Sequence, residues 1–491
     1  MPAPTASKRP NDIRPHSGRA LIRGSQLISM LAASNTVVPH VRAARLYTWR
    51  MAERPALARE LGLWDLVLFN IAAVVGVRWL AAAAHAGPSS IVLWILAAVF
   101  FFVPSALAVS TLSAKFPEQG GLYVWTRRSF GDWHGFLCGW CYWLSNLFYF
   151  PNLLLAGIAM AVYAAGDRYT YLAAARPFLI PASLAVLWIA VVTNVAGWRV
   201  GRWTENLGAV ATYAAGGAII VLGCVVWALH GSATRLDILT GWDWRRANFW
   251  SQIAFAFGGL ELGAMMGGEV RDPRRTIPRA AWVSGGAIAA FYIAGTLALM
   301  AVIPSRDVNI LTGLTQAATS AGAQLGIPVL APALAVLITV GITGQLGAWL
   351  TGSARVPFAI GLDRYLPEAF ARLHPRWGTP YVAMLAQGAA CTVFLLFMQA
   401  GENLRTGYQL LVDMTVITYF IPFLYLFAAA WRNGRRASAL AGIVVTAAGI
   451  GFSLAPPADA QSALMFEAKL VAGCLLLIGA GRVVFVRARL Q

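Results

Sequence analysis

Long apolar runs separated by short polar connections dominate this chain. Runs of about 20 apolar residues, the length that crosses a bilayer as a helix, occur twelve times. They cover approximately residues 61–84, 88–111, 134–165, 177–197, 206–229, 249–269, 280–303, 327–354, 380–400, 408–430, 437–455 and 464–486. No soluble domain fits between them. The pattern predicts an all-α integral membrane protein with twelve transmembrane helices.

Composition and charge agree with this class and predict an orientation. The chain is 58% hydrophobic and 12% charged, whereas ordinary soluble domains are about 25% charged. Cytoplasmic loops carry an excess of Lys and Arg. With the N-terminus inside, internal loops and the C-terminal tail hold nineteen basic residues against seven outside. We therefore expect both termini in the cytoplasm and a place in the cytoplasmic (inner) membrane.

The net charge of +18 is spread over loops and the N-terminus. It forms no single basic stripe, so we expect no nucleic-acid partner. The bilayer is the expected surrounding. Residues 1–56 are basic and rich in proline, and Met51 opens a natural amphipathic entry to the first run. The segment before the first run is either a disordered cytoplasmic tail or an over-extended gene start.

The sixth apolar run is interrupted by Gly258, Gly259 and Glu261, within FAFGGLELGAMMGGEVRDPRRTIP. Non-helical backbone survives in hydrocarbon only where it is buried in protein or lines a cavity, and an intramembrane carboxylate indicates a functional site. The first run is interrupted in a similar way by Gly76 and Arg78. A central Arg costs about 2.5–3.5 kcal/mol on insertion scales. Arg78 should therefore face a pocket or a carboxylate, and a permanent ion pair with Glu261 is the alternative.

Interruptions in the first and sixth runs predict an inverted repeat of five spans. In that pattern, half-helix N-termini point their backbone N–H groups at an anionic group near the bilayer midplane. The predicted architecture is a 5+5 inverted-repeat core with broken helices 1 and 6, plus two extra helices. The core covers residues 57–430, and residues 431–491 hold the two accessory spans and a short cytoplasmic C-terminus.

Three loop motifs and the first span resemble the amino acid-polyamine-organocation (APC) superfamily of secondary transporters. FPEQGGLYVWTRRSFGDWHGFLCGW resembles the family's P-x-x-G-G-x-Y loop, and EVRDPRRTIP resembles E-V-K-N-P-x-R-x-I-P. ARVPFAIGLDRYLPEAFARLHPRWGTPYVAM resembles the loop S-R-x-x-x-A-x-x-x-D-x-x-L-P that ends in G-T-P. The resemblance covers about residues 57–430 and implies a LeuT-like fold of amino acid permease type.

The resemblance also implies a binding site at the two interruptions. Val75, Gly76 and Val77 would hold a substrate carboxylate through backbone N–H groups, with Arg78 beside them. The carbonyls of the second unwound piece would receive the substrate ammonium. That piece comprises Phe257, Gly258, Gly259 and Leu260. Phe255 and Phe257 are candidate gates, although packing alone is the alternative for each.

Two departures from the family pattern affect selectivity and coupling. Arg78 replaces the second glycine of Gly-x-Gly, so it could bind a side-chain carboxylate bidentately and repel polyamines. Thr212 stands where some proton-coupled relatives carry Lys, and its hydroxyl could ligate sodium or merely bond its own helix. Glu261, Thr212, Trp349 and Tyr149 are the candidates for coupling or gating. Gln345, Asn146, Thr415 and Tyr419 are further polar residues that could line the cavity.

The function predicted is a secondary active transporter that moves an amino acid, acidic or otherwise carboxylate-bearing, by alternating access. A polyamine or cationic amino acid transporter and a non-transporting amino acid sensor (transceptor) are the alternatives. No H-E-x-x-H, phosphate-loop or G-x-S-x-G motif indicates an enzyme. We expect no cofactor and no metal site, with H+ or Na+ unassigned as coupling ion. The exact solute, symport or exchange, and the oligomeric state stay open.

Overall fold

The computed structural model describes residues 61–116, 120–237, 247–265, 270–399, 404–456 and 462–490. The chain divides into two units, Met1–Leu57 and Ala58–Gln491, and the description concerns the second. The tail expected over residues 1–56 lies outside the described residues.

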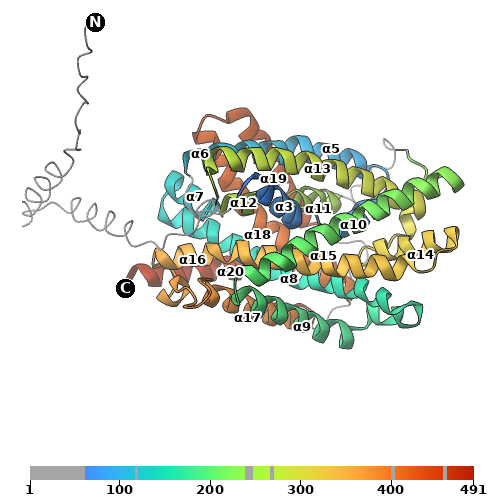
Figure 1. Ribbon diagram of the computed structural model, residues 1–491. Coiled ribbons are helices and arrows are strands. Elements are labelled where there is room, and N and C mark those ends of the chain that lie inside the picture. Colours follow the sequence, from blue (N-terminus) through green and yellow to red (C-terminus); the bar gives the residue numbers. More distant parts are fainter. Residues whose placement is uncertain are drawn as a thin grey trace, which may run out of the picture. The chain divides into compact units, whose positions relative to one another are not determined.

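All regular secondary-structure elements in the described residues are helices, apart from one isolated bridge between Leu61 and Val270. The first repeat comprises α3 (Leu63–Val74), α4 (Arg78–Ala86), α5 (Ser90–Ala97), η1 (Ala98–Phe102), α6 (Val103–Lys115), α7 (Leu122–Phe130), α8 (Asp132–Ala161), η2 (Val162–Ala165), η3 (Asp167–Ala174), α9 (Arg176–Val195) and α10 (Trp198–His230). The second comprises α11 (Ala247–Ala256), α12 (Leu260–Met265), α13 (Pro273–Val302), η5 (Ser305–Asp307), α14 (Gly313–Leu325), α15 (Leu330–Ser353), α16 (Arg355–Leu362), η6 (Glu368–Ala371), α17 (Tyr381–Gln399) and α18 (Leu404–Arg432). Two further helices follow, α19 (Arg436–Ser453) and α20 (Ala463–Leu490) (Figure 1).

Every predicted span has a helical counterpart. Nine helices of the described chain are long and apolar enough to cross a membrane. The other predicted spans correspond to the shorter α17 and to the broken pairs α3/α4 and α11/α12. Helices α10 and α13 begin several residues before the apolar runs, because hydropathy detects only the part of a helix that needs lipid. The structure also adds α7 and α14 within connections.

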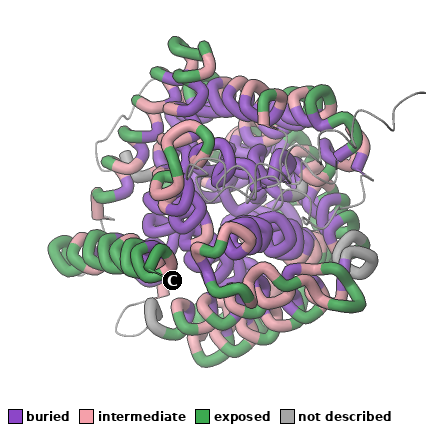
Figure 2. The backbone as a smooth tube through the Cα atoms, turned by 90° about the vertical axis from the view of Figure 1, so that its left-hand side faces the viewer, coloured by how far each residue is buried: buried purple, intermediate pink, exposed green. Residues whose placement is uncertain are grey.

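The interior is built around α8 and α18, the most enclosed of the long helices. Figure 2 shows buried backbone at the centre and exposed backbone on the outer helices. The C-terminal helix α20 lies at the edge and exposes Leu464, Leu475 and Leu476. An exposed apolar face like this one suits lipid better than water.

The two broken helices owe their breaks to local backbone chemistry. Val75 leaves the α3 helix with φ −68° and ψ 98°, and α4 begins at Arg78. Gly259 adopts φ +117°, a region that costs glycine little and other residues much more. A Cβ on Gly258 would lie 2.5 Å from the ring of Tyr419. Both glycines are therefore required at the second break.

One hydroxyl connects the two breaks. Tyr292 of α13 donates to the carbonyl of Val74 (2.7 Å), with that of Ala256 at 3.0 Å as the alternative acceptor. The same oxygen accepts from the N–H of Gly76 (3.1 Å). Its ring stacks on Trp94 with centroids 4.4 Å apart. Backbone groups freed inside a membrane must be satisfied within the protein. Tyr292 does this for Gly76 and Val74 at the first break, and its proton can turn to Ala256 at the second.

Tyr292→Phe should destabilise the fold, because it leaves buried backbone groups without their partner at about 1–3 kcal/mol. The melting temperature of the purified protein measures this. Tyr213→Phe is the matched control, because the buried Tyr213 hydroxyl has no hydrogen-bond partner in the described structure. Equal melting temperatures for the two variants would contradict the bridging role of Tyr292.

Candidate functional site

The structure places the predicted unwound residues at the breaks, with two corrections. Val75, Gly76 and Val77 lie between α3 and α4, but the N–H groups of Val75 and Gly76, expected to hold a carboxylate, already bond the Ile71 carbonyl and the Tyr292 hydroxyl. Phe257, Gly258 and Gly259 lie between α11 and α12. Leu260, expected in the second unwound piece, is instead the first residue of α12. The helix resumes there because the N–H of Leu262 already bonds the carbonyl of Gly259 (3.1 Å).

Helix α15 satisfies the carbonyls of the first break. The Gln345 Nε2 group donates to the carbonyls of Ala73 (3.1 Å) and Val75 (3.2 Å). The Trp349 Nε1 group donates to Ala73 as well (2.7 Å). Thr212 lies elsewhere on α10, with its hydroxyl against Gly341 of α15. The polar groups that face these carbonyls are thus two neutral N–H donors.

Arg78 begins α4 as a buried cation, 2% exposed. Its Nη1 group donates to the Asn152 Oδ1 atom and, at 3.4 Å, to the Tyr408 hydroxyl. The guanidinium carbon lies 4.2 Å from the ring centroid of Trp79 and 5.0 Å from that of Tyr149. Stacking on aromatic faces attracts a cation without neutralising it. The positive charge of Arg78 therefore remains.

One edge of the Arg78 guanidinium is unused. Its Nε and Nη2 atoms are buried and have no hydrogen-bond partner among the described residues. These two N–H groups share the side edge of the planar group, and such a fork matches the two oxygens of a carboxylate. The backbone N–H groups of Val77 and Arg78, at the start of α4, also have no backbone partner in the described chain. All of these are donors, so the first break favours an anion.

Glu261 is satisfied separately, by groups that carry no charge. Its carboxylate accepts from the hydroxyls of Tyr419 (2.6 Å) and Tyr142 (2.9 Å). It also accepts from the backbone N–H of Gly259 at 3.0 Å. The alternative of an Arg78–Glu261 ion pair is therefore wrong within the described structure. Arg78 and Glu261 therefore have separate sets of partners.

Aromatic rings occupy the space between Arg78 and Glu261. Phe255 meets Trp79 at 5.7 Å, Tyr149 at 5.8 Å and Tyr419 at 4.9 Å between ring centroids. Trp349 packs on Tyr149 at 4.9 Å. We call Trp79, Tyr149, Phe255, Trp349 and Tyr419 the aromatic layer. It connects the surroundings of the cation with those of the carboxylate.

Phe257 lies outside the aromatic layer. Its ring packs on Trp94, Phe102 and Tyr292, with centroids 5.6–5.7 Å away. This is the packing alternative of the two that its sequence position allowed. Phe255, in contrast, touches residues around both charges.

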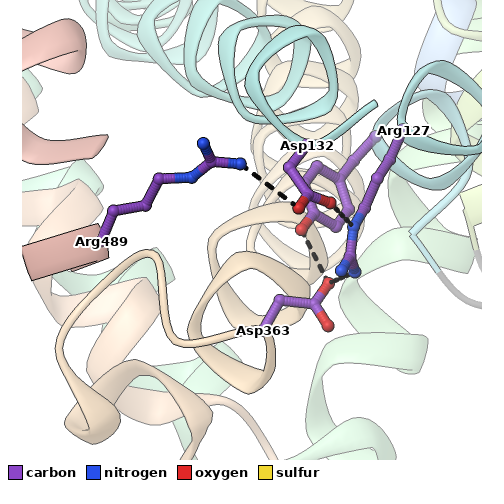
Figure 3. Close-up of polar contacts among 5 residues, drawn as sticks. Arg127, Asp132, Asp363 and Arg489 are labelled. Carbon is purple, nitrogen blue, oxygen red and sulfur yellow. Dashed lines mark hydrogen bonds and ion pairs between the residues drawn. The ribbon is translucent and has the colours of Figure 1, made fainter. Parts of the chain in front are cut away.

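A second polar cluster joins two of the loops that carry the family-like motifs (Figure 3). Arg127 of α7 pairs with Asp363 (2.5 Å) and Asp132 (2.8 Å). The Tyr123 hydroxyl donates to Asp363 (2.7 Å), and Arg489 of α20 reaches Asp132 at 3.6 Å. Burial is the main cause that raises the pKa of Tyr123. The tyrosine therefore stays neutral and remains a donor.

Four contributors were not predicted from the sequence. They are Asn152, Tyr408, Tyr142 and Tyr292. Asn152 carried a usable signal, because an amide in the middle of an apolar span needs an internal partner. The tyrosines carried none, since aromatic residues are common in any membrane helix.

Known proteins resemble the chain along most of its length. It is 26% identical over 446 residues to the uncharacterized transporter lpg1691 of Legionella pneumophila, covering 86% of this chain and 95% of that protein. Identity is 26% with the serine/threonine exchanger SteT of Bacillus subtilis, covering 76% of this chain and 84% of SteT. It is 25% with the glutamate/serine transporter AimA of the same organism, covering 74% and 70%.

A solved structure supports the fold. The crystal structure of MhsT in complex with L-phenylalanine matches with a TM-score of 0.57 and 13% identity, covering 88% of this chain and all of that one. The predicted all-α, LeuT-like fold is thereby confirmed, while the number of membrane crossings stays a prediction. The amino acid permease family model matches residues 61–466. The chain is a multi-pass membrane protein that belongs to the amino acid permease family.

Proposed function

We propose that the protein is a secondary transporter that carries an acidic amino acid, or a related carboxylate, across the cytoplasmic membrane by alternating access. The observation that carries this proposal is the unused Nε and Nη2 edge of the buried Arg78. An uncompensated buried charge is costly unless a partner of opposite charge joins it. A substrate carboxylate is a partner of that kind.

The first break offers two places for oxygen atoms. The free N–H groups at the start of α4 suit one carboxylate, since a helix N-terminus favours negative charge. The guanidinium edge of Arg78 suits a second carboxylate, which it binds bidentately. An amino acid with a carboxyl side chain supplies both. The name of AimA, a glutamate/serine transporter, is compatible with such a substrate.

The second break would handle positive charge. The carbonyls around Phe257, Gly258 and Gly259 would receive the substrate ammonium, and Glu261 would respond to substrate or protons. Glu261 is held by Tyr142, Tyr419 and the N–H of Gly259. A movement of α12 against α8 and α18 would change the hydrogen bonds to the two tyrosines. Phe255, Tyr149 and Trp349 would close the pocket, because their rings already lie between the two charged residues.

The surroundings of Arg78 argue against the polyamine alternative. A second cation beside an uncompensated guanidinium is repelled, and burial strengthens that repulsion. The name of the serine/threonine exchanger SteT, in contrast, gives neutral substrates. An experiment must therefore determine the charge of the substrate.

In this proposal, neutral donors rather than a sodium ion would stabilise the carbonyls of the first break. A sodium ion needs oxygen ligands, and the carbonyls of Ala73 and Val75 already accept hydrogen bonds from Gln345 and Trp349. We therefore propose that Gln345 stabilises the first break in place of a cation. Coupling would rest on protons or on exchange of solutes.

Replacement of Arg78 should abolish the response to acidic amino acids. Loss of one charge-assisted contact of about 1.5–3 kcal/mol weakens binding roughly 10–100-fold, so Arg78→Gln should remove stabilisation by glutamate and aspartate in a thermal-shift assay. Arg78→Lys keeps the charge without the fork and should give an intermediate response. Arg306→Gln, at a highly exposed arginine, is the control. Unchanged stabilisation in Arg78→Gln would contradict the assignment.

Replacement of Na+ by choline should leave glutamate uptake unchanged. The carbonyls of the first break are occupied by neutral donors, so sodium should not alter them. Uptake into proteoliposomes at constant ionic strength measures this. Stimulation that rises and saturates with Na+ concentration would show that Gln345 and Trp349 give way to the ion.

A further inference from the structure

We infer that Asn152 sets the charge class of the substrate, because it is the neutral side chain in hydrogen-bond contact with Arg78 where an aspartate would cancel the cation. The inference rests on the proposed function and goes beyond it by assigning selectivity to a residue that need not touch the substrate. Asn152 is thus a positioning residue for the guanidinium and a selector of net charge.

The orientation of the Asn152 amide follows from its hydrogen bonds. Its Nδ2 group donates to the carbonyl of Phe148 (3.1 Å) and to the hydroxyl of Thr415 (3.2 Å). The Thr415 hydroxyl donates its own proton to the carbonyl of Leu411 (2.6 Å), so it can only accept from Asn152. The Oδ1 atom therefore faces Arg78, whose Nη1 group is a donor.

This network fixes which edge of Arg78 is free. Nη1 is held by Asn152 from α8 and lies near the Tyr408 hydroxyl from α18. The rings of Trp79 and Tyr149 also lie against the guanidinium. The edge that remains consists of Nε and Nη2. A carboxylate that enters the site meets this fork already oriented, so little side-chain entropy is lost on binding.

Every described group around Arg78 is neutral. They include the amide of Asn152, the hydroxyls of Tyr408 and Tyr149 and the ring of Trp79. A zwitterionic amino acid with a neutral side chain carries no net charge and leaves the cation uncompensated. An acidic amino acid carries one net negative charge and neutralises it. The neutrality of Asn152 thus favours the acidic class.

Asn152→Asp tests this inference by placing a carboxylate of nearly the same size beside Arg78. Without ligand, the variant should be at least as stable as the wild type, because a buried cation gains its counter-ion. Its preference for glutamate over serine, measured by competition for uptake in proteoliposomes, should fall about 10-fold or more, as expected for loss of one charge-assisted contact. Retained or increased serine uptake shows that the site still works.

Ser145→Asp is the matched control. Ser145 lies on the same helix, is buried and bonds the carbonyl of Tyr142 rather than Arg78. It tests whether any added carboxylate in α8 alters selectivity. Asn152→Ser keeps the position neutral and should retain the glutamate preference.

Each outcome decides between the claims. If the wild type prefers acidic solutes and Asn152→Asp keeps that preference, the inference is overturned and the proposed function stands. A ligand-free Asn152→Asp that is less stable than the wild type, or does not fold, also contradicts an uncompensated Arg78. If the wild type takes up only neutral or cationic solutes, the proposed function fails, and the inference fails with it.

Discussion

The structure depends on satisfying the backbone groups that two helix breaks free inside the membrane. The Tyr292 hydroxyl lies between the breaks, where it accepts from Gly76 and donates to Val74 or, in its place, to Ala256. Gln345 and Trp349 donate hydrogen bonds to the carbonyls of the first break. At the second break, Glu261 accepts a hydrogen bond from the N–H of Gly259. Without such partners, each exposed backbone group would cost several kcal/mol in hydrocarbon. The breaks therefore persist only because four other side chains fit them.

In the described structure these contacts leave the positive charge of Arg78 without a counter-ion. Glu261 is occupied by two hydroxyls and its own break, so it does not neutralise Arg78. The neutral groups around Arg78 orient it and leave an edge of two donors. The aromatic layer separates the two charges and contacts both surroundings. A solute bound between them would bridge both broken helices, which is how occupancy can be coupled to their movement.

The sequence allowed the helices and breaks to be predicted, since each depends on local composition. Gly76, Gly258 and Gly259 marked the interruptions, and Arg78 was expected in the interior because lipid excludes it. The choice between Phe255 and Phe257 was beyond the sequence, since residues two apart on a helix point about 200° away from each other. Leu260 was expected in the unwound piece, whereas it is the first residue of α12.

Pairing across helices was the other limit. Whether Arg78 meets Glu261 or Asn152 depends on how each helix is rotated against its neighbours, and hydropathy does not encode this rotation. The roles of Tyr292, Tyr142 and Tyr408 arise in the same way. The loop motifs include Tyr123 and Asp363, but only the fold shows that the two side chains are hydrogen-bonded.

A cryo-electron microscopy structure with L-glutamate bound tests the central claim most directly. The account predicts that one carboxylate of the ligand lies within hydrogen-bond distance of both Nε and Nη2 of Arg78, with Nη1 still on Asn152. A bound solute that leaves this edge of Arg78 empty, or an Arg78 that has turned to pair with Glu261, would contradict it.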